Sequence, residues 1–403
     1  MNFLFRQKNK IPQQRQPKNT SRKDEGPLSQ EPDPLALQRV EQRIYPWSER
    51  RVILPPPVDI MKHRGPPPTT PSPSPFPRYG HAGPAVATAT GELYLFGGRV
   101  EDSAQNDLYM ISTRDAAATL VYTAGDVPSP RVSHAGAVVG SVLVVWGGDT
   151  RKRDSTDELD DGLYLLNLGS GEWTRVSVKG SSPTGRYGHA VCTIGSKFYV
   201  FGGQRDGSYL NDLWAFDLQS LRTTPVWNAI EPVEGSPRPV PRTGHACVAH
   251  DKKIFVFGGT DSDYCYNDTW VFDTVTHTWS ELVCIGFIPT PREGHAAAIV
   301  DDVIYIFGGR DMDGRYLSDL GALKLSQRRW YMFRNMGPTL SPRSGHIMAS
   351  MGSQVYVLGG MGEKLTKTEN DHLLHVLDTE RIRYPSANVS HPTDPEKTSK
   401  TPH

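Results

Sequence analysis

Six histidines recur in one short setting along this 403-residue chain, and histidine is the side chain most often used in catalysis or metal binding near neutral pH. They follow the motifs PRYG, PRVS, GRYG, PRTG, PREG and PRSG, and they are His81, His134, His189, His245, His295 and His346. A catalytic or metal-binding histidine has unlike partners, whereas these six share one repeated position. We therefore expect them to hydrogen-bond neighbouring backbone at structural junctions, and we expect no catalytic residue, no metal site and no cofactor.

An arginine stands three residues before each histidine, and its planar guanidinium can bind a carboxylate through two hydrogen bonds. The six are Arg78, Arg131, Arg186, Arg242, Arg292 and Arg343. Because all six units share the residue, we favour the interpretation that each arginine ties down adjacent loops. Contact with the Asp or Glu of a partner is the alternative.

A pair of glycines follows each histidine at a nearly constant distance. The pairs are Gly97 and Gly98, Gly147 and Gly148, Gly202 and Gly203, Gly258 and Gly259, Gly308 and Gly309, and Gly359 and Gly360. Successive pairs are 50, 55, 56, 50 and 51 residues apart, and the step from histidine to first glycine is 13 residues in five units and 16 in the first. Spacing this regular indicates six copies of one structural unit.

Each unit predicts four antiparallel strands. In the fifth, residues 295–300 are small and apolar, Asp301 and Asp302 are turn residues, and 303–307 is rich in β-formers. A third strand follows the glycines, and a fourth surrounds Trp173, Trp227, Trp279 or Trp330 in four of the units. Small residues on inner strands and tryptophans on outer ones suit tapered blades around a channel, so we predict an all-β, six-bladed β-propeller.

These features resemble the kelch repeat, which combines a glycine pair, an aromatic residue about a dozen positions later and a tryptophan after the third strand. The resemblance covers residues 78–384, about three quarters of the chain. The aromatic residues are Tyr109, Tyr164, Trp214 and Trp270, whereas Gly321 and His375 stand there in the last two units. In kelch propellers that capture acidic peptides, arginines at this place contact the ligand, so the resemblance implies that role for the six arginines as well.

Several stretches resemble the fungal cell-end marker kelch proteins in particular. They include WSERRVILPPP at 47–57, DDGLYLLNL at 160–168 and RRWYMFRNMGP at 328–338. Those proteins are scaffolds of polarised growth that travel on microtubules to growing cell tips. The resemblance implies a non-catalytic protein-binding scaffold in the cytoplasm, at the cell cortex or at the tip. Its partners would be other proteins, including acidic peptide segments and cytoskeletal or polarity factors.

The chain divides by composition into five parts. Residues 1–44 form a basic, disordered tail, 45–64 hold an N-terminal closing strand, 65–77 are a proline-rich linker, 78–384 form the propeller, and 385–403 are a second disordered tail. Residues 47–54 resemble the outer strands near Trp173 and Trp279. We expect them to supply the outer strand of the last blade and so to close the ring, because an open ring would expose strand edges.

Charge and cysteine content narrow the classes of function. The chain has 44 basic and 44 acidic residues, which gives no general attraction to nucleic acid or to an anionic membrane. Four cysteines without a CxxC pair fit free thiols in a reducing compartment, and we expect neither a signal peptide nor a membrane span. An oxidase-like or specifier enzyme with a metal in the channel is the alternative function.

Strand direction places the loops after the glycine pairs and the blade-to-blade connections on one face of the ring. The long, irregular loops lie there, namely 149–162, 361–372 and the 222–242 connection. We expect partners to bind this face, because binding residues concentrate on loops that a rigid scaffold positions.

Overall fold

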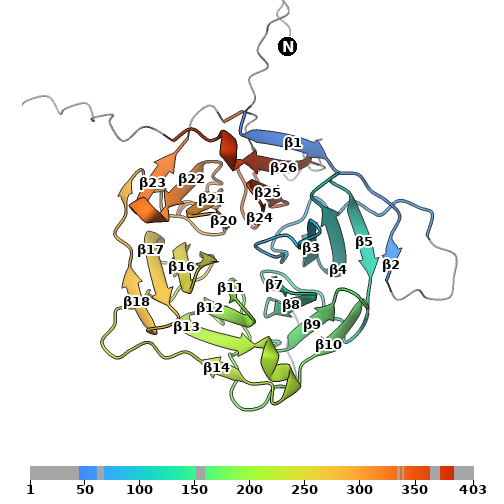
Figure 1. Ribbon diagram of the computed structural model, residues 1–403, viewed down its shortest axis with the longest axis horizontal. Helices are drawn as coiled ribbons and strands as arrows, with labels where there is room; N and C mark the ends of the chain where they lie inside the picture. Colours follow the sequence, from blue (N-terminus) through green and yellow to red (C-terminus); the bar gives the residue numbers. More distant parts are fainter. Residues whose placement is uncertain are drawn as a thin grey trace, which may run out of the picture. The chain divides into compact units, whose positions relative to one another are not determined.

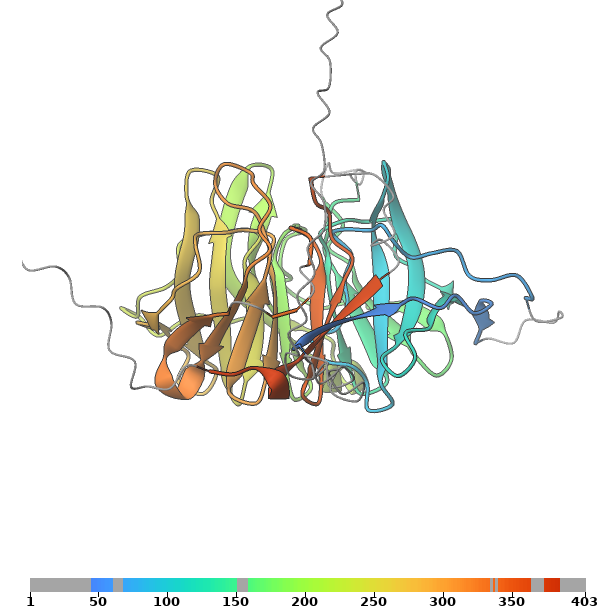
Figure 2. The ribbon, with the colours of Figure 1, turned by 90° about the horizontal axis from the view of Figure 1, so that it is seen from above.

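The computed structural model describes residues 45–60, 68–150, 159–333, 336–337, 340–363 and 373–384. Within these residues six β-sheets stand around a central axis as the blades of a β-propeller (Figure 1). Figure 2 shows the strands running between the two faces of a disc. The predicted all-β class and the six blades are confirmed. Both predicted tails, 1–44 and 385–403, lie outside the described residues.

The first three blades follow the chain order, and the strands of each blade are named from the channel outward. Blade 1 contains β3 (Glu92–Val100), β4 (Ser103–Ser112), β5 (Ala118–Tyr122) and β2 (Val58–Asp59). Blade 2 contains β7 (Ala135–Val139), β8 (Val142–Trp146), β9 (Leu163–Asn167), β10 (Glu172–Arg175) and β6 (Ala124–Gly125). Blade 3 contains β11 (Ala190–Ile194), β12 (Lys197–Arg205), β13 (Ser208–Asp217) and β14 (Trp227–Ala229), with the short helix η2 (Leu218–Arg222) before β14.

The last three blades complete the ring. Blade 4 contains β15 (Ala246–His250), β16 (Lys253–Thr260), β17 (Cys265–Asp273) and β18 (Thr278–Glu281). Blade 5 contains β20 (Ala296–Val300), β21 (Val303–Phe307), β22 (Leu320–Lys324), β23 (Arg329–Met332) and β19 (Ile285–Gly286), with η3 (Leu325–Gln327) before β23. Blade 6 contains β24 (Ile347–Met351), β25 (Gln354–Leu358), β26 (Leu373–Asp378) and β1 (Trp47–Arg51), and η5 (Thr379–Arg381) follows β26.

The second strand of each blade forms the core, because neighbouring blades cover both of its faces. All five residues of β21 are buried, and β8 and β25 follow nearly the same pattern. Such strands read as continuous runs of Val, Ile, Tyr and Phe rather than as an alternation of apolar and polar residues. The small residues of the inner strands, such as Ala296 and Ala298, leave room for the channel.

Blade 1 departs from the expected four antiparallel strands at the channel. Its inner segment forms only a bridge between Ala82 and Phe96, whereas the other five blades have a full inner strand. Pro84 follows closely, and a proline cannot donate the next ladder hydrogen bond. Val86 instead bridges to Ser350 of blade 6, so this segment joins the two blades.

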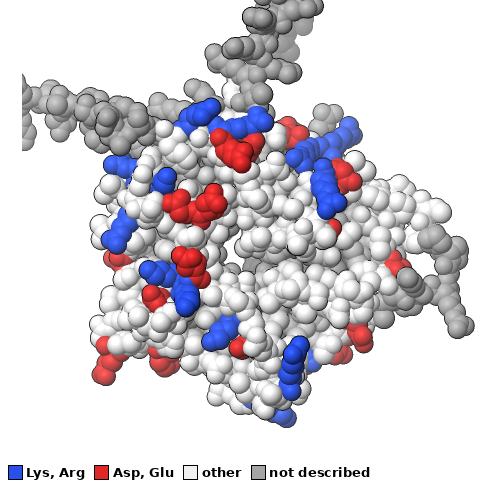
Figure 3. Space-filling view, in the orientation of Figure 1, with Lys and Arg blue, Asp and Glu red and all other residues white. Residues whose placement is uncertain are grey.

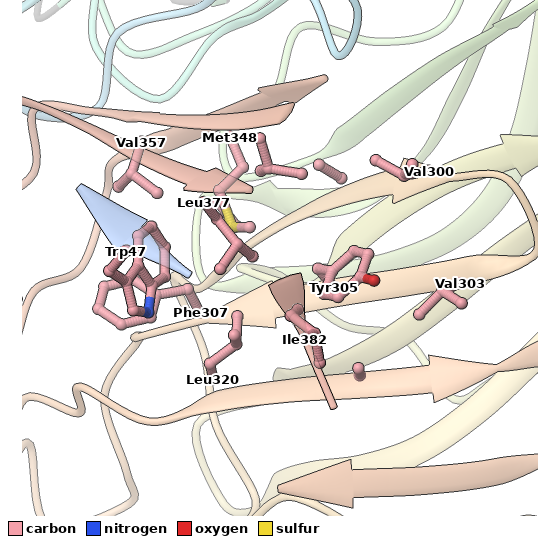
Figure 4. Close-up of a cluster of buried hydrophobic side chains, with 14 of the residues drawn as sticks. Trp47, Val300, Val303, Tyr305, Phe307, Leu320, Met348, Val357, Leu377 and Ile382 are labelled. Atoms are coloured by element: carbon pink, nitrogen blue, oxygen red, sulfur yellow. The ribbon is translucent and has the colours of Figure 1, made fainter. Parts of the chain in front are cut away.

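The N-terminal strand β1 forms the outer edge of blade 6 and thereby joins the two ends of the ring. It pairs antiparallel with β26 over five residues, from Trp47 opposite Leu377 to Arg51 opposite Leu373. Trp47 is buried among residues of blades 5 and 6, and its ring lies 5.8 Å from the ring of Phe307 (Figure 4).

The segments between blades lie along the outer strand of the blade that they enter, and we call these segments connectors. Their contacts are Val58 with Val121, Ala124 with Glu172, Lys179 with Val226, Val233 with His277, Ile285 with Arg329, and Met336 with Trp47. In blades 2 and 5 the connector adds a fifth strand, parallel to the outer one. These fifth strands were not anticipated from the repeat.

Candidate docking site at the mouth of the channel

Each repeated histidine lies in the junction between its own blade and the preceding one. In five junctions the imidazole packs edge-on against the aromatic residue before the glycine pair, with ring centroids 4.9–5.6 Å apart. The pairs are Phe96 with His134, Trp146 with His189, Phe201 with His245, Phe257 with His295, and Phe307 with His346. The expected hydrogen bond to neighbouring backbone is present at His134, where Nε2 lies 3.1 Å from the Phe96 carbonyl oxygen. The expectation is wrong for the other five histidines, whose ring nitrogens have no hydrogen-bond partner among the described residues.

Burial keeps these imidazoles neutral. It lowers the pKa of His81, His189, His245 and His295 to about 3, with a further lowering from the arginine three residues earlier. The pKa of His134 and of His346 is also well below the usual value, for the same two reasons. A neutral, fully buried ring that touches a neighbouring blade suits a packing role.

The glycine pair is required because two histidines approach it. A Cβ on Gly97 would lie 2.9 Å from the ring of His134 in the next blade, and one on Gly98 would lie 2.6 Å from Cβ of His81 in its own blade. Gly359 and His81 repeat the first contact, at 2.6 Å, between the last blade and the first. The two glycines thus let consecutive blades come together at the channel.

A closed ring of backbone hydrogen bonds surrounds the channel at the residue before each histidine. The bonds are 2.7–2.9 Å long and run, donor first, from Gly80 to Gly345, Ser133 to Gly80, Gly188 to Ser133, Gly244 to Gly188, Gly294 to Gly244 and Gly345 to Gly294. All six residues have a φ between 55° and 68°, which explains why five of them are glycine. Ser133, at 55°, is the exception.

This hydrogen-bonded ring narrows the channel. Hydrogen-bonded backbones lie about 4.8 Å apart, so six of them in a ring form a hexagon with sides of about that length. After the van der Waals radii of its atoms are subtracted, the hexagon leaves an opening about 6 Å wide, whereas a polypeptide with its side chains needs about 10 Å. Behind the ring a cavity of about 260 Å³ is lined by the six histidines and by small residues such as Ala190 and Ala246. The opening is therefore too narrow for a polypeptide segment to pass through it.

The six repeated arginines form a second layer next to this ring, which we call the arginine belt. Five of them bind an aspartate of their own blade at 2.5–2.7 Å: Arg78 with Asp107, Arg131 with Asp160, Arg186 with Asp212, Arg242 with Asp268, and Arg292 with Asp319. Every belt arginine also donates to the carbonyl of the first glycine in its own blade. The carbonyl of each arginine accepts from the second glycine of the preceding blade, at 2.8–2.9 Å.

The kelch aromatic on the third strand completes these ion pairs. Trp214 and Trp270 donate from Nε1 to Asp212 and Asp268, each at 2.7 Å. Burial alone would raise the pKa of Asp212, but the hydrogen bonds and charge of Arg186 outweigh it, so that the pKa is lowered. The aspartate is thus held ionised beside its arginine.

The belt has little guanidinium surface to offer a ligand. Arg78, Arg131, Arg186, Arg242 and Arg292 are at most 2% exposed. A partner's carboxylate could reach these five only after their ion pairs had opened, so the structure disfavours their direct capture of acidic peptides. Arg343 is only partly buried; Nη2 lies 3.5 Å from Nε2 of His375, which stands where other blades have the kelch aromatic.

The side chains that do line the mouth differ from blade to blade. In each blade, the residue two positions before the repeated histidine forms a β-bridge with the residue that follows the glycine pair. We call these twelve residues the mouth ring. They are Tyr79 with Arg99, Val132 with Asp149, Tyr187 with Gln204, Thr243 with Thr260, Glu293 with Arg310, and Ser344 with Met361. Their backbone positions repeat while the residue pairs differ. Thr243, Thr260 and Ser344 are buried, which leaves nine of the twelve residues at least partly exposed.

The loops beside the mouth ring add exposed aromatic and acidic side chains. Tyr264, at a hairpin tip, is 66% exposed. The mouth ring and loops 99–104, 149–150, 204–209, 260–266, 309–317 and 361–363 hold ten carboxylates and four arginines, a net charge of −6. All four arginines are paired: Arg99 with Asp102, Arg205 with Asp206, Arg310 with Glu293, and Arg315 with Asp311. The belt adds at most one positive charge, because five of its six arginines are neutralised.

Two of the loops expected on the binding face are described only in part. Residues 151–158 of the 149–162 loop and residues 364–372 of the 361–372 loop lie outside the described residues. By sequence each of these two segments carries equal numbers of acidic and basic residues, so neither changes the charge of the mouth. On the face drawn in Figure 3, acidic and basic side chains are interspersed.

Neither metal binding nor a membrane span gains support within the described ranges. There, no three His, Cys, Asp or Glu side chains come together in a way that could hold a metal ion. The same residues include no helix long and apolar enough to span a bilayer.

Comparison with known proteins identifies the class. The model of the KLHDC2/KLHL20/DRC7 Kelch-repeats domain matches residues 80–309, 133–360 and 286–400. With six blades, a glycine pair in each and aromatic residues on the third strands, the chain belongs to the kelch-repeat propellers.

Its relatives include fungal proteins, two of which are named for tip elongation. Tip elongation aberrant protein 1 of Schizosaccharomyces pombe is 40% identical over 76% of this chain and 26% of its own length. Kelch repeat-containing protein 2 of Saccharomyces cerevisiae is 38% identical over 76% of this chain and 36% of its own length. Tip elongation aberrant protein 3 of S. pombe is 36% identical over 66% of this chain. The chain spans about a quarter to a third of these proteins.

Sequence reasoning found the arginines and missed their aspartate partners. Asp107, Asp212, Asp268 and Asp319 each stand two residues before the kelch aromatic position, and this regularity was available as a signal. In blade 2 the partner is Asp160, four residues before Tyr164, so spacing alone would not have found it.

Proposed function

We propose that this chain is a non-catalytic scaffold of cell polarity that docks partner proteins on the mouth of its propeller. The observation that carries the proposal is the contrast between two layers around the axis. The histidines pack between blades and the glycines and belt arginines are hydrogen-bonded within the ring, in the same way in each blade, whereas the residue pairs of the mouth ring differ from blade to blade. Variable side chains on an invariant frame are typical of a recognition surface.

The kind of partner follows from the chemistry of that surface. Tyrosines provide large, rigid contact area at a small entropic cost, and the mouth has the exposed Tyr264 beside the partly buried Tyr79 and Tyr187. The excess of carboxylates favours a partner segment that carries Lys or Arg, because complementary charge steers association and fixes register. This replaces the acidic peptides that the arginines alone suggested, since the belt neutralises most of its own charge.

The cellular setting is proposed from the relatives. Two of them carry names that refer to tip elongation. We place the chain accordingly among polarity proteins, working with cytoskeletal or polarity factors in the cytoplasm, at the cell cortex or at a growing tip. The propeller would supply the binding platform, and no reaction is assigned to it.

Partner capture by mouth variants tests the proposal. The variant Asp263→Asn/Tyr264→Ala/Asp313→Asn changes three exposed side chains of the mouth loops. We expect at least a tenfold loss of the partners that the wild-type chain captures, with an unchanged melting curve. The control variant Asp251→Asn/Asp301→Asn removes two exposed carboxylates from the turns between first and second strands, at the other end of the blades. Equal capture by the mouth variant and the wild type would refute docking at the mouth.

A further inference from the structure

The connector that enters blade 5 exposes an unusual run of apolar side chains. Val283 is 75% exposed, Ile285 52% and Phe287 63%, and Ile288 follows at 43%. Residues 283, 285 and 287 alternate along an extended segment, of which β19 is the paired part. A contiguous group of exposed apolar side chains often marks an interaction surface, whereas single exposed apolar side chains are common and need no explanation.

Blade 2 shows that the fold does not need these side chains. Its connector makes the same two hydrogen bonds: Ala124 donates to Gly171 as Ile285 donates to Arg328, and Asp126 donates to Trp173 as Phe287 donates to Trp330. The glycine between them has a φ of 83° in blade 2 and 90° in blade 5. Small Ala124 and charged Asp126 therefore support the same backbone that carries Ile285 and Phe287.

The charge next to the two connectors is also reversed. In blade 5 Arg328 immediately precedes the outer strand β23 and Arg329 begins it, whereas the equivalent residues of blade 2 are Gly171 and Glu172. Within the described part of the chain neither Arg328 nor Arg329 forms an ion pair, and neither does Glu172. One rim site is thus apolar and basic, and the other is acidic.

A hollow adjoins the acidic site. A pocket of about 470 Å³ opens between blades 2 and 3, and Glu172 lines it together with Val142, Leu165, Val176, Leu221 and Pro225. Arg175 also lines the pocket, but its guanidinium is directed to Asp160 and Asp161, at 3.6 and 4.0 Å. The pocket thus offers apolar walls and a carboxylate without a counter-ion among the described residues.

We propose that a second copy of this chain occupies the blade 5 surface, with Phe287 and Ile285 of one copy in the blade 2 pocket of the next and Arg329 beside Glu172. The two patches are complementary in charge, both offer apolar side chains, and both are present on one molecule. A contact between two different patches is heterologous. It joins copies into an open chain, unless the rotation from one copy to the next closes a ring.

The position of the two patches gives the assembly its form. Blades 2 and 5 are three blades apart in a ring of six, and β10 and β23 lie on opposite sides of the axis (Figure 1). Contacts at opposite ends of each copy extend a row, so growth continues past the dimer. A few exposed side chains make a small interface, which places the association in the weak, transient class.

Sedimentation velocity of the full chain over about two decades of concentration tests this inference, with the protein itself as the probe. We expect species larger than a dimer to grow with concentration. The variant Ile285→Ala/Phe287→Asp introduces the residues of blade 2, so it should keep the fold, shown by an unchanged melting curve, and weaken association at least tenfold. A chain that stays monomeric, or that stops at the dimer, overturns the proposal.

A charge swap tests the pairing directly. Arg329→Glu and Glu172→Arg each use the side chain that the equivalent blade already carries. Each single change should weaken association at least tenfold, and the double variant should restore most of it. Equal association of single and double variants overturns the pairing of blade 5 with blade 2. The mouth triple variant should associate normally, which separates this contact from partner docking at the mouth.

Discussion

Five junctions between blades are built alike, and the sixth is not. In the five, the aromatic residue before the glycine pair lies between the histidine and the outer tryptophan of the next blade, with ring centroids to the tryptophan 4.9–5.8 Å apart. At the seam between blades 6 and 1, Leu358 stands in place of the aromatic, and β5 of blade 1 contains no tryptophan. The seam therefore lacks the packing that holds the other blades together.

The N-terminal segment fills this gap. Val52 and Phe76 are buried in the same cluster as Leu358, and Arg50 donates from Nη1 to the Thr113 carbonyl of blade 1 at 2.6 Å. Meanwhile Trp47 takes the tryptophan position of blade 6 against Phe307. Near the axis, by contrast, the seam repeats the bonds of every other junction, such as Gly80 to Gly345. The ring thus closes by repetition inside and by a sequence-distant segment at the rim.

Removal of the closing strand should have the largest effect. Deletion of residues 45–54 removes β1 and the burial of Trp47, and a buried tryptophan replaced by alanine alone costs about 3–5 kcal/mol. We expect the free energy of unfolding to fall by more than about 5 kcal/mol in denaturant titrations. Arg51→Ala, at an exposed position of the same strand, is the control and should change little. An unchanged midpoint for the deletion would mean that the inner ring alone holds the seam.

Acid should destabilise all six junctions together. Because the folded pKa of the repeated histidines is about 3 or otherwise below the unfolded value near 6.5, the unfolded chain binds more protons between these pH values. Their contribution is complete above about pH 6.5 and is lost as the pH falls, by up to about 1.4 kcal/mol per pH unit for each histidine.

The measurement is the unfolding midpoint in urea at pH 7.5, 6 and 5. We expect the urea midpoint to decline steeply below pH 6.5. Because the pKa values of the Asp160 and Asp212 carboxylates are lowered, protonation of these groups contributes only at lower pH. His189→Gln should reduce the number of protons taken up on unfolding by about one. Stability that is constant from pH 7.5 to pH 5 would contradict the burial of neutral imidazoles.

The arginine belt distinguishes the ordinary blades from the seam. Asp268→Ala leaves Arg242, which is 0% exposed, without its carboxylate, and loss of one partner of a buried pair costs about 3–5 kcal/mol. In blade 6 His375 lies beside Arg343, which is more exposed, so His375→Ala should cost clearly less. The free energies of unfolding of both variants test this order, with Asp263→Ala as an exposed control. A larger loss for His375→Ala would reverse our view of the seam.

Much of this fold is predictable because the repeat encodes it locally. The constant step from histidine to glycine in five units fixes the inner hairpin, and most strands form within their own unit, with the outer strand β1 of blade 6 as an exception. Blade 1 is harder to predict. Its longer step of 16 residues from histidine to glycine indicates an irregularity, but it does not show that the inner strand, which contains Pro84, is reduced to a bridge. The fifth strands of blades 2 and 5 could not be predicted from the repeat either, because they form only where a connector lies alongside the outer strand of the blade that it enters.

The candidate site was less predictable than the fold, for a reason that Arg131 illustrates. A motif shows that an arginine is present but does not show whether its charge is free. Arg131 is fully buried, and its partner Asp160 lies 29 residues away in the chain. The neutrality of the belt, and with it the acidic character of the mouth, therefore appears only when the first and third strands have folded into the same sheet, with the second strand between them.

The smallest expected effect concerns the one ring position that is not glycine. Ser133 has a φ of 55°, and a left-handed conformation costs an L-residue about 1–2 kcal/mol, while a new glycine costs about 0.4–1 kcal/mol through the unfolded chain. Ser133→Gly should therefore stabilise the protein by about 0.5–1 kcal/mol. The reverse change, Gly188→Ser, should destabilise it by more, because its Cβ would lie 2.1 Å from Thr243 Oγ1. If Ser133→Gly destabilised the protein in urea titrations, the serine side chain would itself have to support the ring, and the six ring positions would not be equivalent.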